Sequence, residues 1–292
     1  MFESRDLLLG LIGCPLGHSL SPALNEFLMS AIHRRGRYEL FETPNDRLGE
    51  TIQALTSRGT AGFNVTIPHK EAVVSYLEEI SEVAQLIGAV NTVSVRNKRL
   101  VGFNTDGVAF KRVLEMRIID MSGKTAVVLG AGGAARAVML YLIRGGVQNI
   151  YLFNRTAARA EQVANYFLKM TGCQNILTAP MDAKAISNVL NSAQLIINAT
   201  SVGMWPHIDQ LPYQFNFDAS HLTAVDLVYN PLETRFLQSA RAAGAMIVDG
   251  LDLFIFQGIE AMKIWTGENL SQVDDKQIRN WLIKKLKSYG TD

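Results

Sequence analysis

The sequence predicts an α/β protein with two domains, each built on a sheet covered by helices. Its 292 residues suit two domains of roughly 150 residues. Short β-branched runs alternate with longer amphipathic segments along most of the chain, which is the pattern of α/β proteins. This alternation breaks at the polar segment Arg117–Lys124 and then begins again. We therefore expect two α/β units in succession.

The first unit is expected to form a largely parallel sheet, because strands and helices follow one another in βαβα order. We predict strands at 8–12, 38–42 and 61–67, a hairpin of strands 90–96 and 100–103 around Asn97-Lys98, and helices at 22–30, 46–57, 69–80 and 106–116. Ser21 is expected to be the N-cap of the first helix, with Pro22 in its first turn.

The second unit has the pattern of a doubly wound nucleotide-binding sheet. Thr125–Leu129 is uninterrupted and apolar, as in a strand buried on both faces. Further strands are predicted at 149–153, 195–198, 224–227 and 246–248, with helices at 134–144, 157–170 and 182–191. The last two helices, 251–265 and 274–287, are expected to pack against the N-terminal sheet. The predicted domains are thus 1–107 completed by 251–292, and 108–250.

Charge and cysteine content exclude several classes of protein. The formal net charge is +1 and there is no long basic run, so binding to nucleic acid or to an anionic membrane is not expected. Cys14 and Cys173 are too few for a disulfide framework, which suits a reducing, cytoplasmic setting. The five histidines include no i,i+4 pair, so no metal site is expected. The sequence leaves the oligomeric state open, including a homodimer.

A glycine-rich turn follows the strand at 125–129. The string Gly-Ala-Gly-Gly-Ala-Ala at 130–135 fits the dinucleotide fingerprint, directly after a buried strand and before a helix. The first glycine allows the tight turn, and the second lets backbone N–H groups approach a diphosphate at the helix N-terminus. The predicted cofactor contacts of this turn are Gly130, Ala131, Gly132, Gly133 and Ala134. The alternative is a glycine turn of structural importance only.

The next strand ends in Asn154-Arg155-Thr156, with Arg159 one helical turn later. An NAD enzyme commonly has a carboxylate here for the ribose diol, whereas a guanidinium offers paired donors to a 2′-phosphate. All four residues are therefore predicted to bind cofactor, with NADP preferred over NAD. In the alternative reading, Arg155 is a solvated surface residue.

Several further strings occur in a fixed order. Before the glycine turn stand Ser19-x-Ser21-Pro22, Asn64-Val65-Thr66-x-Pro68-x-Lys70, Gly88-Ala89-Val90-Asn91-Thr92 and Asn104-Thr105-Asp106-Gly107; after it stand Asn198-Ala199-Thr200-Ser201-Val202-Gly203, Asp226-Leu227-Val228-Tyr229-Asn230-Pro231 and Asp249-Gly250 with Gln257. Over nearly its whole length the chain resembles the shikimate dehydrogenases. The resemblance implies NADP-linked, reversible reduction of 3-dehydroshikimate to shikimate, a step toward aromatic amino acids. It also implies a substrate domain and a Rossmann-type cofactor domain separated by a cleft.

A small polyol carboxylate needs neutral hydrogen-bonding groups and one anion-binding corner. Ser19 and Ser21, just before a helix, can offer hydroxyls and backbone amides to the carboxylate. Asn64 and Thr66 share one face of a strand, either for ring hydroxyls or as a structural hydrogen-bonded pair. The resemblance adds Asn91, Gln257 and Tyr229 as substrate contacts, with capping or core hydrogen bonds as the alternative for the two amides. Thr200, Val202, Met204 and Leu227 are expected to line the nicotinamide pocket, because they follow the third and fourth strands of the cofactor domain. Tyr229 and Gly250 are expected to line the same pocket.

Oxidation of a secondary alcohol also requires a group that takes up its proton. The resemblance places Lys70 and Asp106 in the active site. We favour Lys70 as the proton carrier, with Asp106 accepting a hydrogen bond from the reacting hydroxyl. The opposite assignment stays open. His18 and His69 lie within these motifs and are interpreted as supports of the local backbone.

Two other functions compete with this interpretation. One is a quinate/shikimate dehydrogenase with relaxed substrate and NAD(P) use. The other is a non-catalytic NADP sensor, which would have no reason to keep both Lys70 and Asp106.

Overall fold

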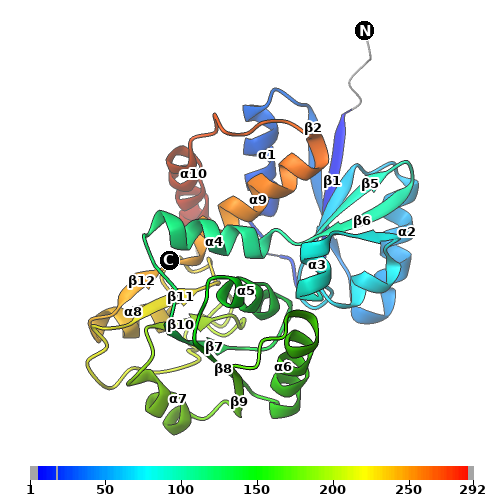
Figure 1. Cartoon of the computed structure of the whole chain (residues 1–292). Coiled ribbons are helices and arrows are strands. Elements are labelled where there is room, and N and C mark those ends of the chain that lie inside the picture. The colour runs from blue at the N-terminus through cyan, green and yellow to red at the C-terminus, as the bar shows by residue number, and fades with distance from the viewer. Residues whose placement is uncertain (1–5, 18, 289–292) are drawn as a thin grey trace. The chain divides into compact units, whose positions relative to one another are not determined.

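The computed structural model describes residues 6–17 and 19–288. These residues fold into two compact units, one made of the described residues up to 105 with 255–285, and the other of 106–254 with 286–288. Each unit is built around one six-stranded sheet with helices packed on it (Figure 1).

The sheet of the first unit is mixed, not largely parallel. Its strands are β1 (Leu7–Gly13), β2 (Gly36–Glu42), β3 (Gly62–Val65), β4 (Glu79–Ile80), β5 (Thr92–Arg96) and β6 (Arg99–Phe103), in the order β2-β1-β3-β5-β6-β4. β5 runs antiparallel to both β3 and β6. Asn97 and Lys98 both have positive φ, +51° and +65°, as a tight two-residue hairpin turn requires. The predicted hairpin is therefore confirmed, and it is what breaks the parallel order.

Helices cover both faces of this sheet. They are α1 (Ser21–Ala31), α2 (Leu48–Ser57) after the 3-10 turn η1 (Asn45–Arg47), the 3-10 turn η2 (Ala72–Tyr76), α3 (Glu82–Ile87), and the C-terminal α9 (Gly250–Thr266) and α10 (Asp275–Ser288). On one face, α2 contributes Leu48, Ile52 and Leu55 to a core with Phe63 of β3. At the sheet, the Trp265 indole donates to Val93 O at 2.9 Å.

Two local predictions in this unit are wrong. The helix predicted at 69–80 is instead η2 and β4, because residues distant in the chain bond its backbone groups. Val90 N donates to Lys70 O at 2.7 Å, and Glu78 N donates to Leu100 O of β6 at 3.1 Å. Ser21 is the first residue of α1 and not its N-cap. The Ser21 N–H donates instead to Ser19 Oγ at 3.2 Å.

The second unit has the doubly wound sheet that was predicted. Its strands are β7 (Thr125–Leu129), β8 (Asn149–Asn154), β9 (Ile176–Pro180), β10 (Leu195–Asn198), β11 (Thr223–Asp226) and β12 (Met246–Val248). All pair in parallel, in the order β12-β11-β10-β7-β8-β9. The order reverses between β7 and β10, where doubly wound sheets bind ligands at the strands' carboxyl ends.

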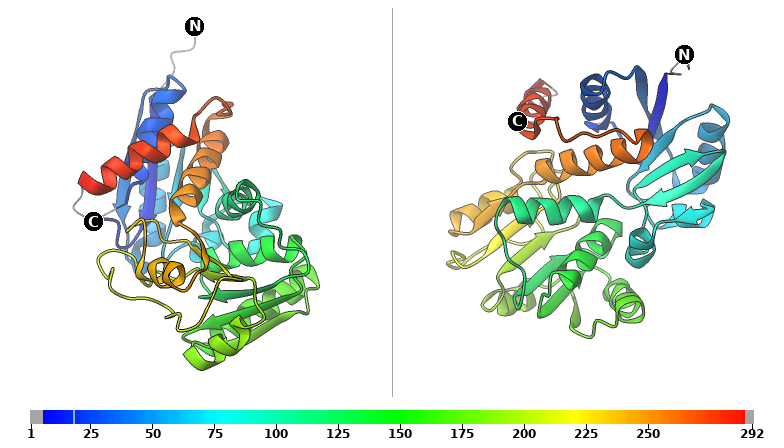
Figure 2. Two further views of the ribbon diagram at one scale, coloured as in Figure 1. Left: turned by 90° about the vertical axis from the view of Figure 1, so that its left-hand side faces the viewer. Right: turned by 45° about the horizontal axis from the view of Figure 1, so that its top comes forward.

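The helices of this unit are α4 (Asp106–Met116), α5 (Gly133–Arg144), α6 (Ala157–Thr171), α7 (Ala183–Leu190) and α8 (Arg235–Ala242), with the first residues of α9 (Figures 1 and 2). β9 and α8 were not predicted. β9 is a half-exposed edge strand that ends in proline, so its apolar pattern is weak. α8 is only eight residues long, and it buries Phe236, Leu237 and Ala240. Across the described ranges, no helix is long and apolar enough to cross a membrane.

Candidate active site

The glycine turn of the second unit has the backbone that the fingerprint requires. Gly130 follows β7 with φ +104°, a conformation that side chains rarely tolerate. A Cβ on Gly130 would lie 2.8 Å from Thr200 Cγ2 and 3.0 Å from Ala199 O. The turn and the loop after β10 are therefore in close contact.

The second glycine of the turn faces open space. Gly132 is the N-cap of α5 and is exposed, and a Cβ placed on it would meet no described atom within 4 Å. The first N–H groups of a helix have no intrahelical acceptor and carry the positive end of its dipole. The start of α5 can therefore accept the diphosphate of a dinucleotide.

The predicted 2′-phosphate contacts lie beside this turn. Asn154 Nδ2 donates to Thr156 O at 2.9 Å, which fixes the bend after β8, and Arg155 and Thr156 are exposed. Arg159 in α6 donates from Nε to Ala131 O at 3.3 Å. One guanidinium is thus tied to the glycine turn, and a second is open to a phosphate.

The loops after β10 and β11 carry the predicted nicotinamide contacts. The Thr200 N–H and hydroxyl donate to Asn198 Oδ1 at 3.1 and 2.6 Å, and Val202 N donates to Thr200 Oγ1 at 3.0 Å. The Leu227 N–H donates to Asn198 O at 3.0 Å. Val202, Met204 and Leu227 are half-buried.

Gly250 and Tyr229 lie around the end of β11. A Cβ on Gly250 would lie 2.5 Å from Val228 O, so only glycine lets the start of α9 approach this loop. Tyr229 stacks on Phe254, with ring centroids 4.2 Å apart and planes inclined by 25°. Tyr229 thus has a packing role, and its contact with the substrate stays a prediction.

In the first unit, the predicted serines lie at the start of α1. Ser19 is half-buried and Ser21 is buried, and Ser19 Oγ accepts from Ser21 N. Asn25 donates to Ser21 O at 2.9 Å. The Ser19 hydroxyl oxygen is the acceptor in its bond to Ser21, and a hydroxyl that accepts one hydrogen bond can also donate one.

Asn64 belongs to a buried polar network. The Tyr38 hydroxyl donates to Asn64 Oδ1 at 2.8 Å, and Asn64 Nδ2 donates to Asn91 O at 3.1 Å and to Thr92 Oγ1 at 3.0 Å. Both N–H groups of the amide are thus in hydrogen bonds within the first unit, and a contact of Asn64 with ring hydroxyls stays a prediction. Thr66 lies just beyond β3 and is half-buried.

The same network fixes the residue that precedes Asp106. Asn91 Oδ1 accepts from Thr105 N at 2.8 Å, and Asn91 Nδ2 donates to Thr105 Oγ1 at 2.9 Å. Lys70 is held through its carbonyl by Val90 N, and its side chain, like those of Asp106 and Gln257, is half-buried. Consecutive residues 90 and 91 thus anchor the backbone on which Lys70 and Thr105 lie.

His69 is buried, and its Nε2 lies 2.7 Å from Thr43 O, consistent with support of the backbone. His18 lies outside the described residues. In residues 6–17 and 19–288, no cluster of three or more His, Cys, Asp or Glu side chains could hold a metal ion.

Comparison with known proteins agrees with these features. The family models "Shikimate dehydrogenase substrate binding domain" and "Shikimate / quinate 5-dehydrogenase" match residues 11–93 and 112–218. A shikimate dehydrogenase (NADP(+)) of Bacillus cytotoxicus is 36% identical over 280 residues, 96% of this chain and 98% of the relative. The chain belongs to the shikimate dehydrogenase family.

Solved structures of shikimate dehydrogenases have the same fold. A shikimate dehydrogenase in complex with NADP+ has a TM-score of 0.87 and 35% identity, covering 98% of both chains. A Thermus thermophilus enzyme in complex with NADP(H) and shikimate has a TM-score of 0.81 and 36% identity, covering 94% of this chain and 97% of that one. A quinate dehydrogenase of Corynebacterium glutamicum with NAD has a TM-score of 0.83 and 31% identity, covering 96% and 99%.

Sequence reasoning missed the residues that hold the predicted contacts in place. Tyr38, Thr92 and Thr105 support the network of the first unit, and Asn198 and Asp226 support the loops of the second. Burial raises the pKa of Asp226 to about 7, although bonds from Thr234, Val228 and Asn198 favour its ionised form. The signal was present, since Asn198 and Asp226 begin two of the recognised strings.

Proposed function

We propose that this chain catalyses the NADP-linked, reversible reduction of 3-dehydroshikimate to shikimate. The observation that carries the proposal is the open glycine turn at the start of α5 with an exposed arginine at the end of β8, in a chain of the shikimate dehydrogenase family. Its relatives are named as NADP(+) enzymes, which agrees with an arginine at this position.

The cofactor fits the second unit. The space before Gly132 and the N-terminus of α5 would hold the diphosphate, and Arg155 with Arg159 would hold the 2′-phosphate. Bound NADPH supplies the hydride of the reduction. The loops at Thr200–Met204 and Leu227–Tyr229 would orient the nicotinamide ring.

Most of the proposed substrate contacts belong to the first unit. Ser19 and Ser21 would bind the carboxylate through their hydroxyl groups, because their N–H groups donate to Leu16 O and Ser19 Oγ. Thr66, Asn91, Gln257 and Tyr229 would bind ring hydroxyls. Asn64 would act through Asn91 and Thr92, because its own amide donors are bonded there.

Lys70 and Asp106 are the proposed catalytic residues. In the direction of oxidation, Asp106 accepts a hydrogen bond from the reacting hydroxyl and orients it, and Lys70 takes the proton as the hydride leaves carbon. In reduction, Lys70 returns the proton to the carbonyl oxygen. The anchored backbone at Lys70 and Thr105 would limit the freedom of both groups.

The direct test is to follow the absorbance of reduced nicotinamide with purified protein. Shikimate with NADP should give turnover, and its kcat/KM should exceed the values for quinate and for NAD. Near-equal values for quinate and NAD would favour the quinate/shikimate dehydrogenase alternative. NADPH binding without turnover of either acid would favour a cofactor sensor.

We propose that the protein acts in a reducing, cytoplasmic environment on a small-molecule substrate. Cys14 and Cys173 are both free thiols, and the net charge of +1 gives no reason to expect a nucleic-acid partner.

A further inference from the structure

A buried carboxylate lies behind the two loops that are proposed to orient the nicotinamide. Asp226 ends β11 and is fully buried, as are Asn198 at the end of β10 and Thr234 before α8. Burial of a carboxyl group costs free energy unless hydrogen-bond donors surround it. The role of Asp226 is therefore sought in its hydrogen bonds.

The two oxygens of Asp226 have different partners. Oδ1 accepts from Asn198 Nδ2 at 2.9 Å and from the Val228 N–H at 3.0 Å. Oδ2 accepts from the Thr234 hydroxyl at 2.6 Å. One oxygen therefore faces the two loops, and the other faces the start of α8.

The Oδ1 contacts determine how the Asn198 amide lies. Because this oxygen accepts hydrogen bonds, the nitrogen of the amide must point toward it and the amide oxygen must point away. That amide oxygen accepts from the Thr200 N–H and hydroxyl, and the amide nitrogen also donates to Val202 O at 3.2 Å. Asp226 thus sets the Thr200–Val202 turn through Asn198, and it holds the next loop directly through Val228.

We propose that Asp226 is a positioning residue for hydride transfer, which fixes the nicotinamide-facing loops of β10 and β11 through Asn198 and Val228. The inference rests on the proposed function, because it assumes that these loops face the nicotinamide. Cofactor affinity is expected to come mainly from the diphosphate and 2′-phosphate contacts at α5 and β8. Loss of Asp226 should therefore lower kcat more than it weakens cofactor binding.

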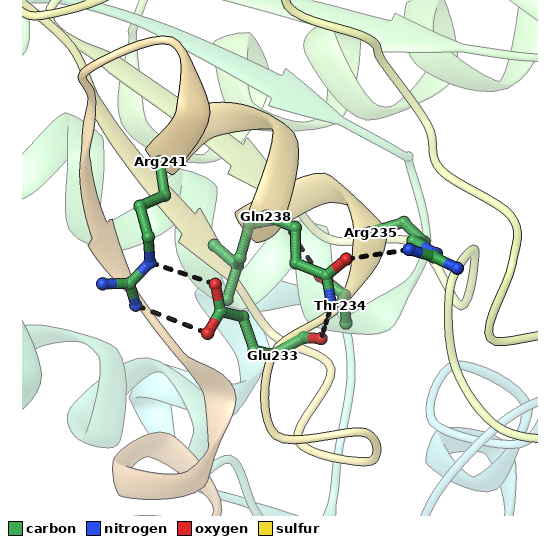
Figure 3. Close-up of polar contacts among 6 residues, drawn as sticks. Glu233, Thr234, Arg235, Gln238 and Arg241 are labelled. Atoms are coloured by element: carbon green, nitrogen blue, oxygen red, sulfur yellow. Dashed lines mark hydrogen bonds and ion pairs between the residues drawn. The ribbon is translucent and has the colours of Figure 1, made fainter. Parts of the chain in front are cut away.

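The start of α8 offers a matched control. Thr234 caps α8 by accepting from Leu237 N at 3.3 Å. Figure 3 shows that this helix start has other ties, since Arg241 Nε lies 3.0 Å from Glu233 Oε1 and Gln238 Nε2 donates to Glu233 O at 3.1 Å. Thr234→Val removes the Oδ2 contact and the cap, and leaves both Oδ1 contacts in place.

The experiment uses four variants and compares those that circular dichroism shows to be folded at the assay temperature. Asp226→Ala and Asn198→Ala should lower kcat roughly 10- to 100-fold, as expected for misplaced reactants, and change the NADPH dissociation constant less than about threefold. Shikimate deuterated at the reacting carbon should show a larger primary isotope effect with both. Thr234→Val should keep kcat within about twofold despite its loss of stability.

Asp226→Asn should recover most of the activity. Its amide oxygen can accept from Asn198 and Val228, and its nitrogen can donate to Thr234. If Asp226→Ala does not fold, the comparison of Asp226→Asn, which should stay active, with Asn198→Ala, which should lose kcat, still tests the inference. The inference is overturned if Asp226→Ala and Asn198→Ala lose only thermal stability, or if Thr234→Val lowers kcat as much as they do.

NADPH binding, measured by fluorescence without substrate, separates this inference from the proposed function. A wild-type protein that binds NADPH but does not oxidise shikimate would refute the proposed function. The role of Asp226 would then be tested with another carbonyl acid that the wild type reduces, by comparing the rate of hydride transfer in each variant. A wild-type protein that binds no NADPH would overturn both.

Discussion

Among single residues, Lys70 has the most direct role in the proposed chemistry. Removing its amine takes away the group that carries the proton but leaves the hydroxyl and carboxylate contacts of the substrate. We expect Lys70→Ala to lower kcat by roughly 10²- to 10⁴-fold with little change in KM. Steady-state assays should include Lys276→Ala, which alters an exposed lysine on α10. A variant that changed KM alone would make Lys70 a binding residue.

Arg155 is expected to set the choice of cofactor. Its guanidinium is exposed at the end of β8, where a 2′-phosphate would form charge-assisted hydrogen bonds worth about 1.5–3 kcal/mol. Arg155→Ala should therefore raise the KM for NADP roughly 10- to 100-fold and leave the KM for NAD nearly unchanged. Equal changes for the two cofactors would show that Arg155 does not recognise the 2′-phosphate.

At the scale of an element, α4 is followed by Ile118 in the left-handed backbone conformation, which isoleucine disfavours. Ile118 has φ +56° and its side chain is 92% exposed. Ile119 N donates to Leu114 O at 2.9 Å and Ile118 N donates to Glu115 O at 3.0 Å, which is the pairing of a Schellman helix end. Glycine is the residue that normally occupies this position.

Ile118→Gly should therefore stabilise the protein. The left-handed conformation costs a side-chain-bearing residue about 1–2 kcal/mol, and the exposed isoleucine side chain loses little on removal. After the entropy cost of glycine, we expect a gain of about 1 kcal/mol in the free energy of unfolding, measured with urea. Ile118→Ala keeps the Cβ, so its free energy of unfolding should rise clearly less. An equal rise for both variants would show that the effect comes from loss of the isoleucine side chain and not from the backbone conformation.

At the scale of the whole molecule, Asp226 links folding stability to pH. Burial raises the pKa of this carboxyl to about 7, whereas an aspartate in an unfolded chain ionises near pH 4. Between these values the folded state keeps a proton that the unfolded state releases. Its contribution is therefore complete below pH 4 and is lost as pH rises to about 7, by at most about 1.4 kcal/mol per pH unit.

Asp226→Asn removes this titration and nearly preserves the shape of the side chain. Because other carboxyl groups also titrate, the useful quantity is the difference between wild type and variant in thermal unfolding midpoint. We expect the wild type to lose stability relative to Asp226→Asn as pH rises from 5 to 7.5. Parallel curves over this range would show that Asp226 does not titrate there.

The sequence alone determined those features that depend on local pattern. The apolar run of β7, the glycine turn after it and the Asn97-Lys98 hairpin each follow from residues that are adjacent in the chain. Local backbone preference and apolar periodicity are enough to predict such elements. The ordered motifs likewise identified the family without reference to the fold.

Only the tertiary structure decided how polar groups and backbone bonds are shared between distant segments. Segment 69–80 does not form the predicted helix because Val90 and strand β6 supply partners for its backbone. Asn64 proved to be bonded to Tyr38 and Thr92, and Asp226 to Asn198 and Thr234. A buried polar group must find its partner wherever the fold brings one, and the sequence order does not state which distant residue that will be.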